Sequence, residues 1–260
     1  MRGLFRTHEA ILWILTVTVS LILLGGVWHI ASSLVNRPYL PSPSAVLVEL
    51  WLLMKSGELG FHIVATLVRV FAALSLAAAL ATISGIVAVR TSLGKPLRIL
   101  VTLLIPVPMM ALLPLFIKVF GFEVIKVVLI IATLYPILTV GVSEAVSRVP
   151  REYEELLISM GAGFMHVLKF VILPSIFMPL MTSLRICIGV ALSLTFVVES
   201  AIMSSRDFGS YGLGVLIETA YRIYDYTTVY AGLVTLSALG FTMYGILWLV
   251  EVQYRRTRKL

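Results

Sequence analysis

Three charged side chains, Arg69, Arg185 and Glu199, lie inside long apolar stretches of the sequence. A charge is costly inside a lipid bilayer, so such a side chain usually pairs with another charge, meets backbone carbonyls or contacts a polar substrate. Arg69 and Glu199 are expected in the same half of the membrane, and we predict that they form an ion pair. Arg185 is expected nearer the opposite face, where Glu144 or a backbone carbonyl would be its partner. The alternative for either arginine is contact with an anionic substrate.

The most polar part of the chain, residues 144–176, also carries apolar side chains at helical spacing, among them Met160 and Phe164. A helix that is charged on one face and apolar on the other needs a partner surface when it lies outside the membrane. Gly161 and Gly163 permit a sharp turn that residues with a Cβ resist. The pattern therefore predicts two short helices, joined by a glycine turn, that dock on another surface.

Prolines interrupt the apolar run 99–117 at Pro106, Pro108 and Pro114. A proline removes a backbone donor and clashes with the preceding helical turn. Inside lipid, the carbonyls that this frees need partners from protein or water. The run therefore has either a face that lines a cavity or a kink that serves packing. Pro136 predicts a further kink in the next apolar run.

Residue groups typical of enzymes are missing from the sequence. There is no Gly-x-x-x-x-Gly-Lys-Ser/Thr phosphate-binding loop, so we expect no ATP hydrolysis by that mechanism. The glycine cluster 209–214 follows no predicted strand, which argues against a dinucleotide site and favours a flexible outer loop. The four histidines lack metal-ligand spacing. We therefore expect neither a cofactor nor a metal in this chain.

Composition assigns the chain to the membrane proteins. Of its 260 residues, 60% are hydrophobic and only 13% are charged, and the mean hydropathy is +1.04. That leaves too little polar surface to cover a soluble globule of this size. The single cysteine, Cys187, cannot form a disulfide within the chain. We expect an all-α integral membrane protein.

Six apolar runs are long enough, or nearly so, to cross a bilayer as helices. They are continuous rather than alternating, which favours helices over strands. The first is too long for the apolar region of a signal peptide, and we interpret it as an uncleaved anchor. The fifth ends at a turn predicted at residues 204–206. The six predicted spans are 10–36, 70–89, 99–117, 127–143, 179–203 and 226–250.

The distribution of basic residues predicts the orientation of these spans. With both termini in the cytoplasm, twelve lysines and arginines fall on the inner side and six on the outer side. This bias favours an N-in, C-in topology. The net charge of +7 is then explained by membrane topology, and we expect no nucleic-acid partner.

We expect three parts along the chain. Residues 1–57 form an N-terminal anchor span and an outer amphipathic helix, for which Ser42 or Ser44 is the N-cap. Residues 58–248 form the transmembrane domain. Residues 249–260 form a basic tail, which the topology places in the cytoplasm.

The polar loop between the fourth and fifth predicted spans resembles a motif of permease subunits of bacterial and archaeal ABC importers. In that family the motif reads Glu-Ala-Ala, three residues, Gly, nine residues, then Ile-x-Leu-Pro. This chain keeps the spacing, with leucines for the two alanines and valine for the isoleucine. We refer to residues 150–175 as the coupling loop. The matching positions are Glu155, Leu156, Leu157, Gly161, Val171, Ile172, Leu173 and Pro174.

The resemblance implies a role for each part of the motif. In the family this loop docks in a groove of an ATPase subunit and transmits its motion, and Glu155 would be the charged contact there. Gly161 and Gly163 would make the turn. Pro174 would help to separate the second helix, which runs to Leu173, from the fifth span.

The resemblance extends over nearly the whole chain and implies partners. Two copies of the chain, or one copy and a close relative, would form the pathway of an ATP-driven importer. Two ATPase subunits would bind ATP and Mg²⁺, and an extracytoplasmic binding protein would deliver the solute. The protein would lie in the cell membrane of a prokaryote. The rival interpretation is an ion-coupled secondary transporter or a channel, although the spans hold few acidic residues for an ion site.

Several segments resemble one branch of the family, whose members import nitrate, sulfonates, taurine, bicarbonate, pyrimidine precursors of thiamine or other small heterocycles. That branch implies a small solute, anionic or heterocyclic. The segments are Leu40–Pro43, Thr66–Val70, Pro106–Pro108, Leu113–Phe116, Ser183–Ile186 and Val197–Glu199.

Overall fold

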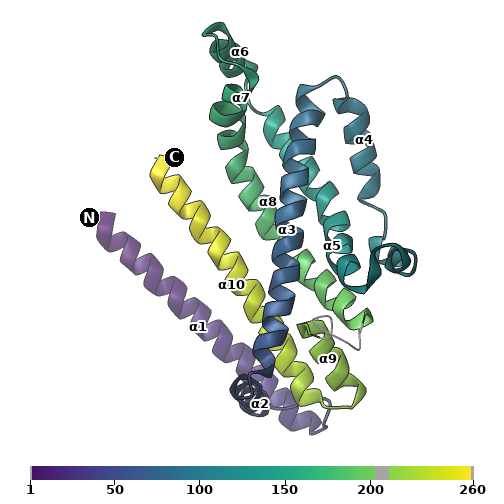
Figure 1. Ribbon diagram of the computed structural model, residues 1–260. Helices are drawn as coiled ribbons and strands as arrows, with labels where there is room; N and C mark the ends of the chain where they lie inside the picture. The colour runs from purple at the N-terminus through teal and green to yellow at the C-terminus, as the bar shows by residue number, and fades with distance from the viewer. Residues whose placement is uncertain (1, 203–210, 259–260) are drawn as a thin grey trace. The chain divides into compact units, whose positions relative to one another are not determined.

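The computed structural model describes residues 2–202 and 211–258, and within these ranges its regular elements are all helical (Figure 1). The turn predicted at residues 204–206 and the last basic residue, Lys259, lie outside the described residues. The chain divides into two compact units. Unit 1 comprises Met1–Gly60 and Leu216–Val234, and unit 2 comprises Phe61–Val215 and Thr235–Leu260.

In unit 1, helix α1 (Arg2–Val35) is followed by the short helix α2 (Pro43–Lys55). The Ser42 hydroxyl accepts a hydrogen bond from the backbone nitrogen of Ala45, so Ser42 is an N-cap of α2, as predicted. The connection between the two helices is held by the Trp28 indole, which donates to the carbonyl of Pro41 at 3.1 Å.

Helices α4 to α8 lie wholly within unit 2. Helices α3, α9 and α10 each have residues in both units. A 3₁₀ turn, η1, precedes α5, and a π-helical turn, η2, precedes α8. The bounds are α3 Glu58–Arg90, α4 Gly94–Leu104, η1 Met109–Leu112, α5 Leu113–Ser147, α6 Arg151–Ser159, α7 Phe164–Val167, η2 Leu168–Ile172, α8 Leu173–Ala201, α9 Leu213–Arg222 and α10 Tyr226–Arg258.

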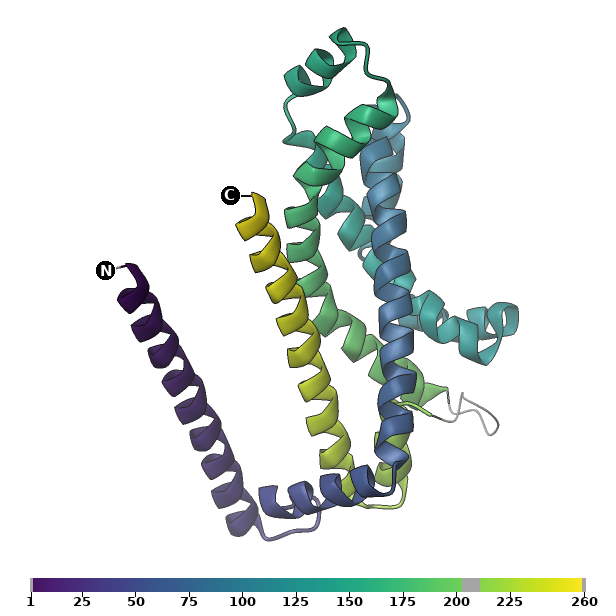
Figure 2. The same cartoon turned by 60° about the vertical axis from the view of Figure 1, so that its left-hand side comes forward.

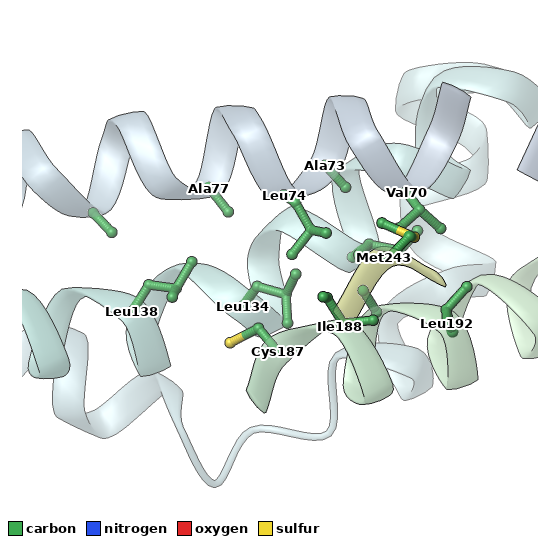
Figure 3. Packing of buried hydrophobic residues seen from close by; sticks show 13 residues of the cluster. Val70, Ala73, Leu74, Ala77, Leu134, Leu138, Cys187, Ile188, Leu192 and Met243 are labelled. Carbon is green, nitrogen blue, oxygen red and sulfur yellow. The ribbon is translucent and has the colours of Figure 1, made fainter. Parts of the chain in front are cut away.

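The core of unit 2 lies where α3, α5 and α8 meet (Figure 3). Helix α3 contributes small side chains such as Ala73 and Ala77, which are fully buried. They face Leu134 of α5 and, on α8, Cys187 and Ile188. Small residues let apolar helices approach closely, which is the usual way in which membrane helices pack. Cys187 is itself part of this buried cluster.

Within the described residues, four helices are long and apolar enough to span a membrane, or five if one bent pair of helices counts as a single span. The prediction of six spans therefore needs correction in one region. The predicted spans 99–117 and 127–143 are not two straight helices. Instead α4 is only 11 residues long, and it meets the η1–α5 segment at an angle of 81°.

Prolines and a glycine account for this bend. Helix α4 ends before Pro106, and α5 begins with Pro114 in its first turn, where the missing backbone donor costs nothing. Gly121 then has a φ of 74°, which interrupts the helical backbone within α5. Pro136, by contrast, lies inside α5, which remains assigned as one helix there.

The predicted sites are distributed over two ends of unit 2 and the helices between them. Helices α6 and α7 stand beyond the end of the bundle at which α3 ends and α8 begins (Figure 2). The start of α3 and the end of α8 lie at the other end. Each of the sequence-predicted sites belongs to one of these ends, or to the bent α4–α5 segment and the helix faces between them.

Candidate functional site: the coupling loop and the buried charges

Helix α6, the first helix of the coupling loop, has no fully buried residue. Its apolar side chains Leu156 and Ile158 are 59% and 58% exposed, and Met160 at its end is 75% exposed. Glu155 is exposed on the same helix. The predicted combination of charge and uncovered apolar surface is therefore present in the fold.

The turn between α6 and α7 depends on one glycine rather than two. Gly161 has a φ of 85°, a conformation that side chains with a Cβ resist. Its nitrogen donates to Ile158, and the nitrogen of Ala162 donates back to Leu157, which is the Schellman pattern of helix termination. Gly163 has ordinary extended angles, φ −79° and ψ 169°. The prediction that Gly163 is also needed for the turn is therefore not supported by its conformation.

The prediction that Pro174 separates the coupling loop from the next span is wrong. Helical structure runs without a break from Phe164 to Ala201. The turn before Pro174, Leu168–Ile172, is π-helical. A π turn is wider than an α turn and changes which carbonyls need a donor, so it accommodates the proline without ending the helix. Leu173 and Pro174 thus form the first turn of α8.

Arg90, the last residue of α3, connects the coupling loop to the bundle. Its guanidinium forms an ion pair with Glu154 of α6. The same guanidinium donates to the carbonyls of Val146 and Val149, at 3.3 and 3.2 Å, where α5 ends. In the sequence, Arg90 is one of the basic residues that flank the predicted spans on the inner side. Nothing in the sequence pairs it with Glu154, which lies 64 positions away.

At the opposite end of unit 2, Arg69 and Glu199 form the predicted ion pair, with 2.8 Å between Nη1 and Oε1. Both side chains are almost completely buried, at 4% and 1% exposure. Arg69 also donates to the carbonyl of Tyr211 at 2.7 Å and to Glu123 at 2.9 Å. The predicted pair is confirmed, and it belongs to a larger network.

Two members of this network were missed at the level of sequence. Lys126 is fully buried and donates to Glu123 Oε1 at 2.6 Å. In the sequence, Lys126 directly precedes the predicted span 127–143, at its expected outer end. Its spacing of three from Glu123, on one helix face, was the available signal. With Arg69 and Glu199, these residues make two acidic and two basic side chains, so their charges balance.

The glycine cluster also belongs to this network. Glu199 accepts hydrogen bonds from the nitrogen of Gly214 and from the Thr66 hydroxyl, both at 2.9 Å. Thr66 in turn accepts from the nitrogen of Leu213 at 2.8 Å. Side chains from α3 and α8 therefore cap the first turn of α9, where free amide groups and the helix dipole favour negative charge.

The flexible outer loop expected at 209–214 is not what the described part of that cluster forms. Gly212, Leu213 and Gly214 are buried. A Cβ on Gly212 would lie 2.5 Å from the Glu199 carboxyl carbon. These glycines therefore serve close packing against a charged side chain. Residues 209 and 210 lie outside the described range.

Arg185 has a different partner from the one expected. It pairs with Glu251 of α10 at 2.8 Å and lies over the ring of Tyr244. Glu144, the predicted partner, is 61% exposed and lies 3.9 Å from Arg148. The predicted partner was wrong because α10 runs beside α8 and brings Glu251, 66 positions away in the sequence, to Arg185.

The three prolines of the predicted third span mark the bend between α4 and α5. The bend is filled with apolar side chains: Met109 packs with Ile125 of α5 and Val198 of α8. This contact supports the packing interpretation of the break. Pro106, Pro108 and Pro114 flank the buried segment.

The chain matches a known family over most of its length. Residues 73–259 match the family described as "Binding-protein-dependent transport system inner membrane component". The taurine transport system permease protein TauC of Escherichia coli is 30% identical over 239 residues, covering 88% of this chain and 84% of that protein. The riboflavin transport system permease protein RibX of Chloroflexus aurantiacus is 30% identical over 251 residues, covering 91% and 88%.

The fold is also that of a solved transporter. A chain of the inward-facing MetNI methionine ABC transporter superposes with a TM-score of 0.60 at 18% identity, and the match covers 79% of this chain and 97% of that one. At this identity the likeness concerns the fold. Together with the matched family and the two relatives at 30% identity, it assigns the protein: this chain belongs to the binding-protein-dependent transport system inner membrane components, the multi-pass permease subunits of ABC importers.

Proposed function

We propose that this chain forms half of the translocation pathway of an ATP-driven importer, beside a second copy or a close relative. An ATPase subunit docks on the coupling loop of each half. The observation that carries the proposal is the uncovered surface of α6, on which Leu156, Ile158 and Met160 lie exposed around Glu155.

Lipid is a poor partner for that surface. Helix α6 contains one basic and three acidic residues within nine positions, and none of its residues is buried. Charges of that density do not enter the hydrocarbon region of a bilayer. Exposed apolar side chains at such a polar site are typical of a protein-binding surface. The groove of an ATPase subunit, as in the family, supplies an apolar wall and a charged partner for Glu155.

The proposed solute is a small organic anion of the sulfonate type, or a small heterocycle. The support comes from relatives named for taurine, aliphatic sulfonates, riboflavin and formylaminopyrimidine transport. Arg69 and Arg185 are each paired with a carboxylate. Anion recognition is therefore assigned to an extracytoplasmic binding protein rather than to these two arginines.

The energy for transport comes from the ATPase subunits. ATP and Mg²⁺ are bound by the ATPase subunits, and the chain itself has no Gly-x-x-x-x-Gly-Lys-Ser/Thr loop. ATP binding would favour one of two conformations of the paired permeases, and hydrolysis would restore the other. The proposed location is the cell membrane of a prokaryote, with both termini in the cytoplasm.

The test is gentle detergent purification of the chain from its native membranes, followed by mass spectrometry. We expect an ATPase subunit to copurify with the unaltered chain and to be lost from Glu155→Ala. The matched control is Glu144→Ala, an exposed carboxylate at the same end of the bundle but outside the coupling loop, which should retain the subunit. In proteoliposomes, uptake that continues on an ion gradient without ATP would instead assign the chain to the ion-coupled transporters or channels.

A further inference from the structure

Helix α6 faces the bundle with only two of its side chains. Glu154 and Leu157 are partly covered, whereas the other seven residues of α6 are exposed. Their spacing of three places them on one face of the helix. Leu157 packs against the apolar cluster that contains Ile86 of α3 and Val146 of α5. Glu154 reaches Arg90.

Arg90 is a junction of three helices. It ends α3, it donates to the carbonyls of Val146 near the end of α5 and of Val149 just beyond it, and it pairs with Glu154 of α6. The carbonyls at a helix C-terminus lack partners within the helix and carry partial negative charge, so a guanidinium satisfies them well. Its planar array of donors can bind carbonyls and a carboxylate together, which the single ammonium of lysine cannot do equally well. The side chains of Arg90 and Glu154 are 11% and 16% exposed.

The two helices of the coupling loop are thus tied to the bundle in different ways. Helix α7 continues directly into α8, so a force on α7 reaches α8 through the helix itself. Helix α6 is joined covalently to α5 through residues 148–150 and to α7 through the turn at residues 160–163, and neither of these connections leads to α3. The Arg90–Glu154 ion pair is a direct polar contact between α6 and α3.

We propose that Arg90 is the positioning residue that makes α3 and the end of α5 follow the coupling loop when the ATPase moves it. This inference rests on the proposed function and deepens it: Glu155 serves docking, whereas Glu154, the neighbouring residue, faces inward and serves transmission. Loss of the Arg90–Glu154 pair leaves docking intact and uncouples ATP hydrolysis from transport.

The first measurement is solute transported per ATP hydrolysed, in proteoliposomes that contain the complete transporter. Arg90→Gln retains a polar side chain and removes the charge that Glu154 needs, and Glu154→Gln removes the other charge. We expect each variant to keep its ATPase subunit and to lower the ratio by about two- to thirty-fold, the range known for residues that carry coupling between sites. The ratio of the double variant should be no lower than that of the more impaired single variant, because both substitutions remove the same interaction. Arg90→Lys should be intermediate.

The matched control is the exposed pair Arg148 and Glu144, which lies at the same end of the bundle with side chains 81% and 61% exposed. Arg148→Gln and Glu144→Gln should leave the ratio unchanged. A ratio that stays at the unaltered value in Arg90→Gln, or additive losses in the double variant, would overturn the inference.

A second measurement needs no ATPase subunit. The chain has one cysteine, Cys187, which is buried and can be replaced by serine. Spin labels at Glu152→Cys on α6 and Phe71→Cys on α3 occupy exposed positions. We expect a narrow distance distribution that broadens in Arg90→Gln, and an unchanged distribution would overturn the link. If the distribution broadens in Arg90→Gln but the unaltered chain captures no ATPase subunit, the structural link between α6 and α3 is supported and the proposed function is overturned.

Discussion

The buried carboxylate of Glu199, on α8, accepts a hydrogen bond at 2.9 Å from the backbone nitrogen of Gly214, in the first turn of α9. The same carboxylate pairs with Arg69 of α3. One side chain thus neutralises a buried cation and caps a helix that begins only fourteen positions later in the chain. Replacing Glu199 therefore disturbs two structural features at once.

Removal of one partner of the Arg69–Glu199 pair is expected to be strongly destabilising. Glu199→Gln leaves Arg69 buried with a reduced complement of negative charge, and breaking a buried pair in this way costs about 3–5 kcal/mol. Thermal unfolding in detergent should show the loss. Arg69→Gln together with Glu199→Gln should cost less than the sum of the two single changes, and strict additivity would contradict a direct pair. As a control, Arg222→Ala removes an exposed ion pair and should change stability by less than about 1 kcal/mol.

Gly214→Ala should destabilise the chain for a steric reason. A Cβ at this position would lie 2.6 Å from the backbone oxygen of Phe196 and 2.7 Å from the Cβ of Glu199. Backbone cannot move aside cheaply, so the first turn of α9 would be pushed away from its cap. Gly60→Ala is the matched control, since Gly60 lies in helix α3 with open space around it. Equal melting temperatures for the two variants would show that Gly214 is not packed as described.

Gly161 and Gly163 are expected to respond differently to alanine, although they lie two positions apart. Neither Cβ would meet a neighbouring atom, so the difference comes from the backbone alone. Gly161 has a positive φ, in which alanine costs about 1–2 kcal/mol. Gly163→Ala, at extended angles, should retain the ATPase subunit in the copurification experiment, whereas Gly161→Ala should weaken its capture. Equal capture by the two variants would mean that the Schellman turn is not needed for docking.

Glu251→Ala should destabilise the chain more than Arg185→Ala. Glu251 is 5% exposed and pairs with both Arg185 and Arg255. Without Arg185, its carboxylate keeps the bond to Arg255, whereas without Glu251 the mostly buried Arg185 loses its carboxylate partner, which is the costlier defect. In thermal unfolding, Glu251→Ala should have a lower melting temperature than Arg185→Ala. Arg255→Ala, which changes an exposed arginine, should have the melting temperature closest to that of the unaltered chain. The reverse order would show that the cation–π contact of Arg185 with Tyr244 matters more than the ion pair.

Much of the candidate site was predictable from local sequence. The helices follow from long apolar runs, because backbone groups in lipid must be satisfied within the segment. The two short helices of the coupling loop follow from its apolar side chains at helical spacing, and their turn follows from Gly161; the coupling role itself was implied by the resemblance to ABC importer permeases. The pairing of Arg69 with Glu199 follows from the high cost of an isolated charge in apolar surroundings. In each case the governing physics acts within one segment or between two conspicuous charges.

Only the tertiary structure decided the rest. Arg185 had two candidate partners in the sequence analysis, and the packing of α10 beside α8 selected a third, Glu251. Arg90 looked like an ordinary topology signal until the end of α5 and Glu154 were brought to it. Composition and periodicity report what one segment needs, namely a counter-charge, a cap or a covered face. Which distant residue satisfies that need depends on how the helices pack, and that arrangement is set by the shapes of many side chains together.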